Sequence, residues 1–359
     1  EISGSKQRQA PLGSPERQSL VDPRQVESFL DEIVMISQRS EEYNGFMLGK
    51  LRSVGGEVAG HAARENVFRG GQFNCTAREV TGYYITMEEY YVEEMVNKAI
   101  ELDELTADQL VSSLVDDTFF IMQKCARRAL ATGSLQCCCA LLTELNNILA
   151  SGFRAAVAAK LANAGQRVMA AMPNDPLLDE SGGGSQPHEA AVMVNNAETS
   201  GVYLHKLRQE IERAAMELFT GAAERERVKS CLADLSKTSS DFHTMAAKAL
   251  EALAGAMFPR LCPALDEVAA LTYQPSEAEY AAMEAEEAWT ARLLLAMEAR
   301  LAWLRPMLIP AAYDGLVAHL VDKVAARLEA IVSKKAFNQL GGLAMDRDVR
   351  TLVSHLAEL

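Results

Sequence analysis

Residues 110–129 read LVSSLVDDTFFIMQKCARRA. The preceding residues 106–109, Thr-Ala-Asp-Gln, match a capping box, which predicts a helix start at Thr106. No proline occurs between Pro23 and Pro173. Because proline removes a helix hydrogen bond and clashes with the preceding turn, this run permits long helices. One apolar stripe continues for about five turns at helical spacing, through Leu110, Leu114, Ile121, Cys125 and Ala129.

Similar stripes extend along the chain in both directions. Further capping boxes predict helix starts at Thr86 and Ser276. The run 338–342 is expected to end a helix, and Asp346 is expected to cap the last helix of the chain. Alternation of period two is confined to a short run near Val80. The sequence therefore predicts an all-α fold of long helices, arranged as bundles or as an elongated rod. The stripes predict helices over residues 24–50, 86–102, 135–172, 189–219, 228–253, 294–304 and 313–331.

Composition shifts suggest how the chain is divided. We expect Gly182, Gly183 and Gly184, with the prolines around them, to mark a linker. The predicted division is a disordered tail over 1–25, a helical bundle over 26–172 with a mobile Gly-rich insert at 53–74, a linker over 173–188, a second bundle over 189–275, and the start of a truncated carboxy-terminal bundle over 276–359.

The last predicted helix carries an apolar face, formed by Val349, Leu352, Val353, Leu356 and Leu359. We expect the turn at Gly341 and Gly342 to fold this helix back on the 313–331 helix. Such a turn covers only part of the face and leaves the rest free for self-association.

Composition narrows the class of function. The chain has 359 residues, 49% of them hydrophobic, and a net charge of −14. This charge argues against general nucleic-acid binding and against adhesion to an anionic membrane, because only the small basic clusters 127–128 and 334–335 could compensate. We find no transmembrane segment, signal peptide or initiator Met, and we interpret the chain as part of a longer protein. The seven cysteines are expected to be reduced thiols in the cytosol.

The motifs of common enzyme classes are missing from the sequence. There is no P-loop, dinucleotide fingerprint, nucleophile elbow, His-Glu-x-x-His or Glu-x-x-His. Adjacent cysteines project about 100° apart on a helix, so Cys137, Cys138 and Cys139 are expected to pack, two inside and one at the margin. Asp116-Asp117 lacks the further Asp of a magnesium motif, and we expect a polar edge or a partner for Lys124 or Arg128. The acid-rich run 277–287 is interpreted as a solvated helix face. No catalytic, cofactor-binding or metal-binding residue is predicted.

Three segments together resemble one known family. They are residues 75–99, which contain Gly-Tyr-Tyr-Ile-Thr-Met-Glu-Glu-Tyr-Tyr at 82–91, residues 112–120, Ser-Ser-Leu-Val-Asp-Asp-Thr-Phe-Phe, and residues 337–343, Phe-Asn-Gln-Leu-Gly-Gly-Leu. The chain is similar here to subunit 4 of the conserved oligomeric Golgi (COG) tethering complex, with weaker support from residues 40–43 and 230–235. The resemblance runs from about residue 30 to the end. Compared with the family, we expect the chain to lack the amino-terminal coiled coil and the last helices.

This resemblance implies a rod of consecutive helical bundles, as in other multisubunit tethering complexes. It implies a non-catalytic subunit without a cofactor, held peripherally at the cytoplasmic face of the Golgi and in the cytosol. The expected role is intra-Golgi retrograde transport and recycling of Golgi enzymes. The expected partners are the other COG subunits, and syntaxin-type SNAREs with their regulators. The residues alone leave three alternatives open: an all-α enzyme with an unrecognised site, a generic helical scaffold and a membrane-surface binder.

Overall fold

The computed structural model describes residues 22–53, 58–106, 108–173, 185–285 and 289–357. These residues form helices joined by short connections, and no strand occurs among them. The elements are α1 (Pro23–Ser53), α2 (Val58–Arg69), α3 (Gln72–Glu101), α4 (Ser113–Ala131), α5 (Leu135–Ile148), the π-helical turn η1 (Leu149–Phe153), α6 (Arg154–Leu161), α7 (Ala164–Ala171), α8 (Ser185–Leu218), α9 (Ala222–Met257), η2 (Phe258–Arg260), α10 (Cys262–Ala270), α11 (Glu277–Ala285), α12 (Trp289–Leu304), η3 (Arg305–Met307), α13 (Pro310–Val332) and α14 (Gln339–Leu356).

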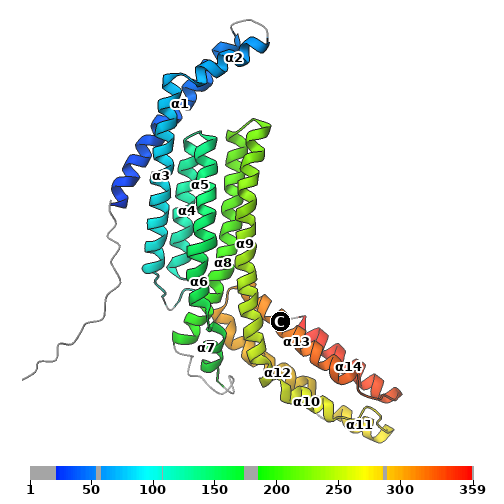
Figure 1. The fold of residues 1–359 in the computed structure, drawn as a ribbon. Helices are drawn as coiled ribbons and strands as arrows, with labels where there is room; N and C mark the ends of the chain where they lie inside the picture. The colour runs from blue at the N-terminus through cyan, green and yellow to red at the C-terminus, as the bar shows by residue number, and fades with distance from the viewer. Residues whose placement is uncertain (1–21, 54–57, 107, 174–184, 286–288, 358–359) are drawn as a thin grey trace, which may run out of the picture.

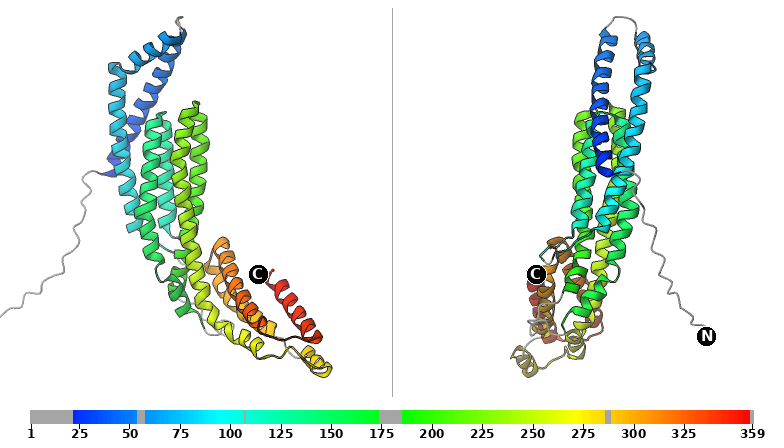
Figure 2. Two further views of the ribbon diagram at one scale, coloured as in Figure 1. Left: turned by 45° about the vertical axis from the view of Figure 1, so that its right-hand side comes forward. Right: turned by 90° about the vertical axis from the view of Figure 1, so that its left-hand side faces the viewer.

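The helices build an elongated molecule, which confirms the predicted all-α rod (Figures 1 and 2). The hairpins α4–α5 and α8–α9 stand side by side in the middle. On one side, α1 and α3 pair into an arm, and the upper part of this arm, with α2, reaches beyond the other helices. At the opposite end, α10 to α14 form a lower lobe that bends away from the central hairpins.

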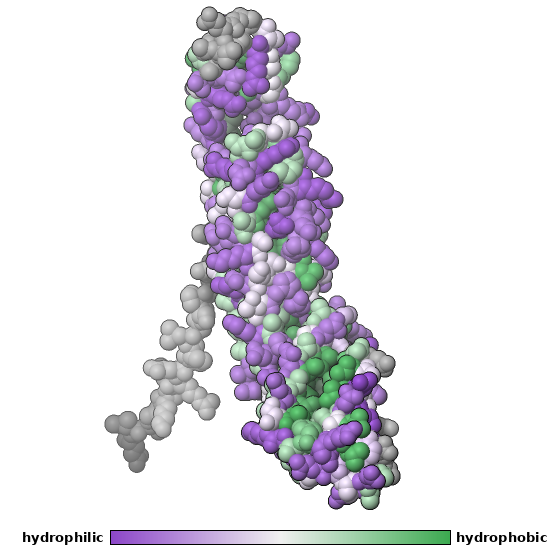
Figure 3. All heavy atoms as spheres, turned by 90° about the vertical axis from the view of Figure 1, so that its right-hand side faces the viewer, coloured by the Kyte–Doolittle hydropathy of each residue, from purple (hydrophilic) through white to green (hydrophobic). Residues whose placement is uncertain are grey.

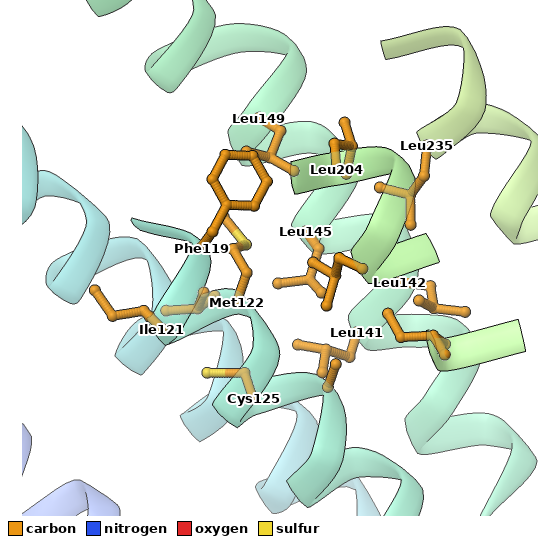
Figure 4. Packing of buried hydrophobic residues seen from close by; sticks show 14 of the residues in the cluster. Phe119, Ile121, Met122, Cys125, Leu141, Leu142, Leu145, Leu149, Leu204 and Leu235 are labelled. Carbon is orange, nitrogen blue, oxygen red and sulfur yellow. The ribbon is translucent and has the colours of Figure 1, made fainter. Parts of the chain in front are cut away.

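The first hydrophobic core lies between α4, α5, α8 and α9, with α3 covering one side (Figure 4). Its centre holds Phe119 and Met122 from α4 and Leu145 from α5, which meet Leu204 and Leu235 from the second hairpin. Full burial of one such side chain stabilises the fold by about 1.5–3 kcal/mol relative to exposure. The same core contains four residues of the stripe from which the sequence predicted a long helix: Leu114, Ile121, Cys125 and Ala129.

A second core lies lower down and shares the two longest helices. Leu250, Leu253 and Met257 near the end of α9 pack with α7 and α13, and the same core continues into α10 and α12. Because α8 and α9 contribute to both cores, helices from the predicted bundles 26–172 and 189–275 pack together here. Whether the predicted bundles 26–172 and 189–275 are each stable alone is a separate question, so the predicted division stays a prediction.

Buried amides on α8 join the two levels of the rod. The Asn195 side chain donates to the carbonyl of Leu110 at 2.8 Å and to that of Met307 at 2.9 Å, and accepts from the Ile309 amide at 3.1 Å. Asn195 has no exposed surface. Since a buried amide is costly without partners, these bonds fix where the lower lobe meets the central hairpins.

Two of the predicted helix starts are wrong. Thr86 lies inside α3, where its hydroxyl donates back to the carbonyl of Gly82 at 3.2 Å, as hydroxyls in helix interiors do. The helix expected from Thr106 begins only at Ser113. There the Asp103 carboxylate accepts from the Leu114 amide at 3.0 Å and caps the helix from outside the predicted box. A capping box works only where a helix begins: α3 continues through Thr86, and the described residues between Thr106 and Ser113 are not helical.

The third predicted box is confirmed. Ser276 precedes α11, its amide donates to the Glu279 carboxylate at 2.8 Å, and the Glu279 amide donates to the Ser276 hydroxyl at 3.4 Å. Hydrogen bonds from the backbone and hydroxyl of Ser276 lower the pKa of Glu279. The reciprocal pattern works here because nothing precedes α11 that could extend it.

Several predicted boundaries fall elsewhere. The Gly-rich insert contains α2 and the start of α3, and residues 54–57 within it lie outside the described part of the chain. The helix expected over 135–172 breaks at Asn163, whose φ of 62° is left-handed and is tolerated by asparagine. Of the predicted tail, residues 1–21 are not described, while Pro23 already begins α1. Of the predicted linker, 174–184 are not described, and α8 begins at Ser185.

The start of α14 also corrects a prediction. The run 338–342 begins this helix rather than ending the previous one, because the Asn338 side chain accepts from the Gly341 amide at 2.8 Å as its N-cap. A Cβ on Gly341 would lie 1.9 Å from the Tyr273 carbonyl oxygen, so only glycine fits this contact. The helix packs mainly on α11 and α12 rather than folding back on α13, and Asp346 lies within it.

Candidate interaction surfaces

The cysteine run lies in the first core. Cys137, Cys138 and Cys139 begin α5 and are all buried, so the third thiol is not at a margin as we expected. Burial raises the pKa of the Cys138 thiol to about 12 and that of Cys139 to about 11. Such thiols stay protonated at neutral pH, whereas nucleophilic attack and metal binding need a thiolate. Among the described residues, no group of three or more His, Cys, Asp or Glu side chains converges on a possible metal position.

The acidic pair on α4 is exposed, as expected for a polar edge, and does not partner Lys124 or Arg128. Burial, with the Asp116 carboxylate beside it, raises the pKa of Tyr203 on α8, which places Asp116 at the α4–α8 contact. Lys124 and Arg128 bind carboxylates from other helices, Glu27 on α1 and Glu88 on α3. Lys124 and Arg128 thus pair with carboxylates on facing helices and not with the acids along α4.

A buried ion pair joins the arm to the central hairpins. Arg128 donates from Nε to Oε2 of Glu88 at 2.8 Å and from Nη2 to Oε1 at 2.7 Å, a bidentate arrangement. The two side chains are 6% and 1% exposed. The guanidinium also lies 4.8 Å from the ring centroid of Tyr91 and 3.7 Å from the Asp31 carboxylate on α1. Three helices are thereby held around one charged group.

A second, more exposed pair continues this contact outward. Glu27 on α1 binds Lys124 on α4 and accepts from the Tyr91 hydroxyl at 3.1 Å. The Lys124 hydrogen bond is the main cause that lowers the pKa of Glu27, although partial burial opposes it. Together the two ion pairs fix the position of the arm helices α1 and α3 against α4.

Sequence reasoning missed the Glu88–Arg128 pair because Glu88 was read as part of the Thr86 capping box. A signal was available in the spacing of α3. Tyr84, Glu88 and Tyr91 fall on one helix face, and both tyrosines are buried. A charge in the middle of an apolar face indicates a buried partner.

The outer face of α1 is an apolar surface, which we call the α1 stripe: Phe29, Met35, Ile36, Tyr43 and Phe46. These side chains are 44–61% exposed, while the opposite face of α1 packs on α3. Near its middle, Met35, Ile36, Tyr43 and Phe73 of α3 line a shallow hollow of about 400 Å³. Phe73 meets the Tyr43 ring edge-on at 4.9 Å between centroids. A ready-made hollow of this kind suits a side chain from another helix.

A second apolar surface lies on the lower lobe. On α14, Leu343, Val349 and Val353 are exposed while Leu352 is buried, so part of the predicted face is free. Figure 3 shows hydrophobic surface gathered and hollowed over this lobe. Leu359, the last residue of the predicted face, lies outside the described residues.

A third surface lies where α1, α3 and α4 meet at the base of the arm. Leu102 and Phe120 are about 70% exposed there, beside a groove of about 470 Å³ that also carries Lys98, Asp117 and Lys124. The mixture of apolar and charged side chains is typical of protein contacts.

The small basic clusters are partly occupied by internal contacts. Arg128 is buried with Glu88, and Lys335 donates to the carbonyls of Ala269 and Leu271 at the end of α10. They therefore offer little free positive charge to an anionic membrane. Within the described ranges, no helix combines the length and apolar character needed to cross a bilayer.

Comparison with known proteins relates the chain to one family. Residues 2–161 match the family described as COG4 transport protein, middle alpha-helical bundle, and residues 190–358 match Conserved oligomeric Golgi complex subunit 4, C-terminal. Among solved structures, the C-terminal domain of the exocyst subunit Sec6p has a similar fold, with a TM-score of 0.55 over 79% of this chain and 72% of that one, at 11% sequence identity.

Whole-protein relatives agree. Over 94% of the chain, it is 37% identical to Conserved oligomeric Golgi complex subunit 4 of Arabidopsis thaliana and 29% identical to that of Homo sapiens. The chain spans about half the length of these relatives, 45% and 47% respectively. The chain thus belongs to the family of conserved oligomeric Golgi complex subunit 4.

Proposed function

We propose that the chain is part of a non-catalytic subunit of the COG tethering complex, acting in intra-Golgi retrograde transport and the recycling of Golgi enzymes. Its partners are the other subunits of the complex and syntaxin-type SNAREs with their regulators. It is held at the cytoplasmic face of the Golgi through these partners.

Family membership is the observation that carries the proposal. The arrangement of the molecule supports it further. The buried ion pair Glu88–Arg128 lies inside the molecule and positions the arm. The exposed surfaces described above are apolar and lie on separate parts of the rod. Separate apolar surfaces suit simultaneous contact with several proteins.

Affinity capture of the full-length protein from cell extract tests the proposal. We expect mass spectrometry to identify sister subunits together with syntaxin-type SNAREs. Phe120→Glu and Val353→Glu each place a charge on one surface and should each remove a subset of partners. Glu226→Lys, at an exposed site on α9, is the control and should keep all the partners. Capture of a folded protein without any sister subunit would contradict the proposal.

A further inference from the structure

Four of the five residues of the α1 stripe follow a seven-residue repeat, and Met35 lies outside it. Phe29, Ile36 and Tyr43 are spaced by seven, and Lys50 occupies the next position of that row. A second row, three residues further along each repeat, holds Glu32, Arg39, Phe46 and Ser53. Two rows at this spacing are the a and d positions of a coiled coil, and every side chain in them is exposed.

These rows complement themselves when two α1 helices run antiparallel. In an antiparallel coiled coil, an a residue faces a d residue of the partner helix. With the two-fold axis at Glu41, Ile36 faces Phe46 of the other copy, and Arg39 faces Tyr43. Glu32 faces Lys50 in the same register, so the central layers are apolar, cation–π and ion-pair contacts, while the outermost layer pairs Phe29 with Ser53.

Charge favours a second copy along this arm. The whole chain has a net charge of −14, which makes most approaches of two copies repulsive. Residues 29–53, which carry the two rows, contain three basic and four acidic residues, so this part of α1 is close to neutral. The upper part of the arm also projects beyond the central hairpins (Figures 1 and 2).

We propose that the α1 stripe is a homodimer interface, in which two copies of the chain pair their α1 helices antiparallel through a two-fold axis at Glu41. Each layer then occurs twice, because a two-fold interface presents the same surface from both copies. The proposal does not depend on the proposed Golgi function.

Cross-linking tests the register directly. Ile36→Cys and Phe46→Cys, introduced together, face each other between copies. Within one helix they lie about 15 Å apart, too far for an internal disulfide. Mild oxidation of the purified chain should give a covalent dimer on a non-reducing gel, and much less with Ile36→Cys alone. Both sites are exposed, so circular dichroism should be unchanged. A double variant that cross-links no better than the single one would overturn the register.

Sedimentation of the purified chain tests the association itself. Between micromolar and near-millimolar concentration, the sedimentation coefficient should rise. Glu32→Lys and Lys50→Glu should each weaken association about ten-fold or more, because each replaces two attractions by two repulsions. The double charge swap should restore it.

Two controls separate this interface from other causes. Glu226→Lys makes the same charge change as Glu32→Lys but away from the arm. Val353→Asp alters one of the exposed apolar residues of α14, through which the sequence predicted self-association. If the α1 stripe is the interface, and not the α14 face, both variants should associate like the unchanged chain. A monomer at every concentration, or association lost through Val353→Asp but kept by Glu32→Lys, would refute the proposal.

Discussion

At the scale of single residues, Glu88 and Arg128 carry the largest electrostatic consequence. Removing one partner of a buried ion pair leaves an uncompensated charge, which costs about 3–5 kcal/mol. We therefore expect Glu88→Gln to lower the free energy of unfolding by about that amount in urea titrations. Combining it with Arg128→Met should recover part of the loss, since neither charge then remains buried.

The exposed pair Asp346–Arg350 gives the control for this experiment. It joins successive turns of α14 with side chains 58% and 79% exposed. Arg350→Met should change stability by less than about 0.5 kcal/mol. Equal losses for Glu88→Gln and Arg350→Met would mean that the buried pair adds nothing beyond a surface contact.

Gly341 and Gly342 differ sharply although they are neighbours. A Cβ on Gly341 would meet the Tyr273 carbonyl, whereas nothing lies within 4 Å of one on Gly342. Gly341→Ala should thus destabilise the lower lobe by about 1–3 kcal/mol, as overpacking does. Gly342→Ala should be neutral or slightly stabilising, because alanine favours the helix. Thermal melts followed by circular dichroism compare the two, and similar behaviour would argue against the close contact.

At the scale of elements, the contact of α1 with α4 should depend on pH through Glu27. Its pKa lies below the ordinary value of 4.5, chiefly because Lys124 donates to it. A carboxyl with a lowered pKa stabilises the fold above that ordinary value and loses the effect as pH falls through its own pKa. Glu27→Gln should therefore cost up to about 1 kcal/mol at neutral pH. The gap should close as pH falls from about 5 to 3; a gap independent of pH would contradict this.

The sequence predicted helix type well and helix ends less well, for a physical reason. Long stripes such as the one through Leu114 and Ile121 sum many weak preferences, and the fold keeps them. A capping box involves one turn, so it yields when packing extends a helix through it, as at Thr86. The box at Ser276 survived where α11 starts afresh from a loop.

The interaction surfaces were harder to predict than the helices. The free part of α14 could be predicted, because the stripe from Val349 to Leu359 has more apolar surface than the expected packing partner covers, and Val349 and Val353 are indeed exposed. The α1 stripe could not, because α1 has apolar residues on two faces and the sequence does not tell which one α3 covers. The Glu88–Arg128 pair depends on α3 and α4 meeting at one level, which only the packing decides.

At the scale of the whole molecule, the shared helices α8 and α9 decide whether the rod unfolds in parts. The predicted linker separates α1–α7 from α8–α14, yet α4 packs on α8 and α5 packs on α9. Across the same division, Asn195 donates to the Leu110 carbonyl, and Asn196 accepts from the Ser112 amide at 3.0 Å. Backbone continuity is therefore a small part of what holds the two halves together.

Cutting the chain at the linker tests this directly. A specific protease site inserted between Gly183 and Gly184 allows cleavage of the folded protein. We expect the two fragments to co-elute in gel filtration and to separate only in denaturant, because the first core buries side chains from both. Leu145→Ala, which removes a wholly buried side chain from that core, should weaken the fragment complex by about 2–5 kcal/mol. Leu343→Ala, at an exposed site on α14, should leave it unchanged. Fragments that separate without denaturant would instead make residues 26–172 and 189–275 independent bundles, as the sequence alone suggested.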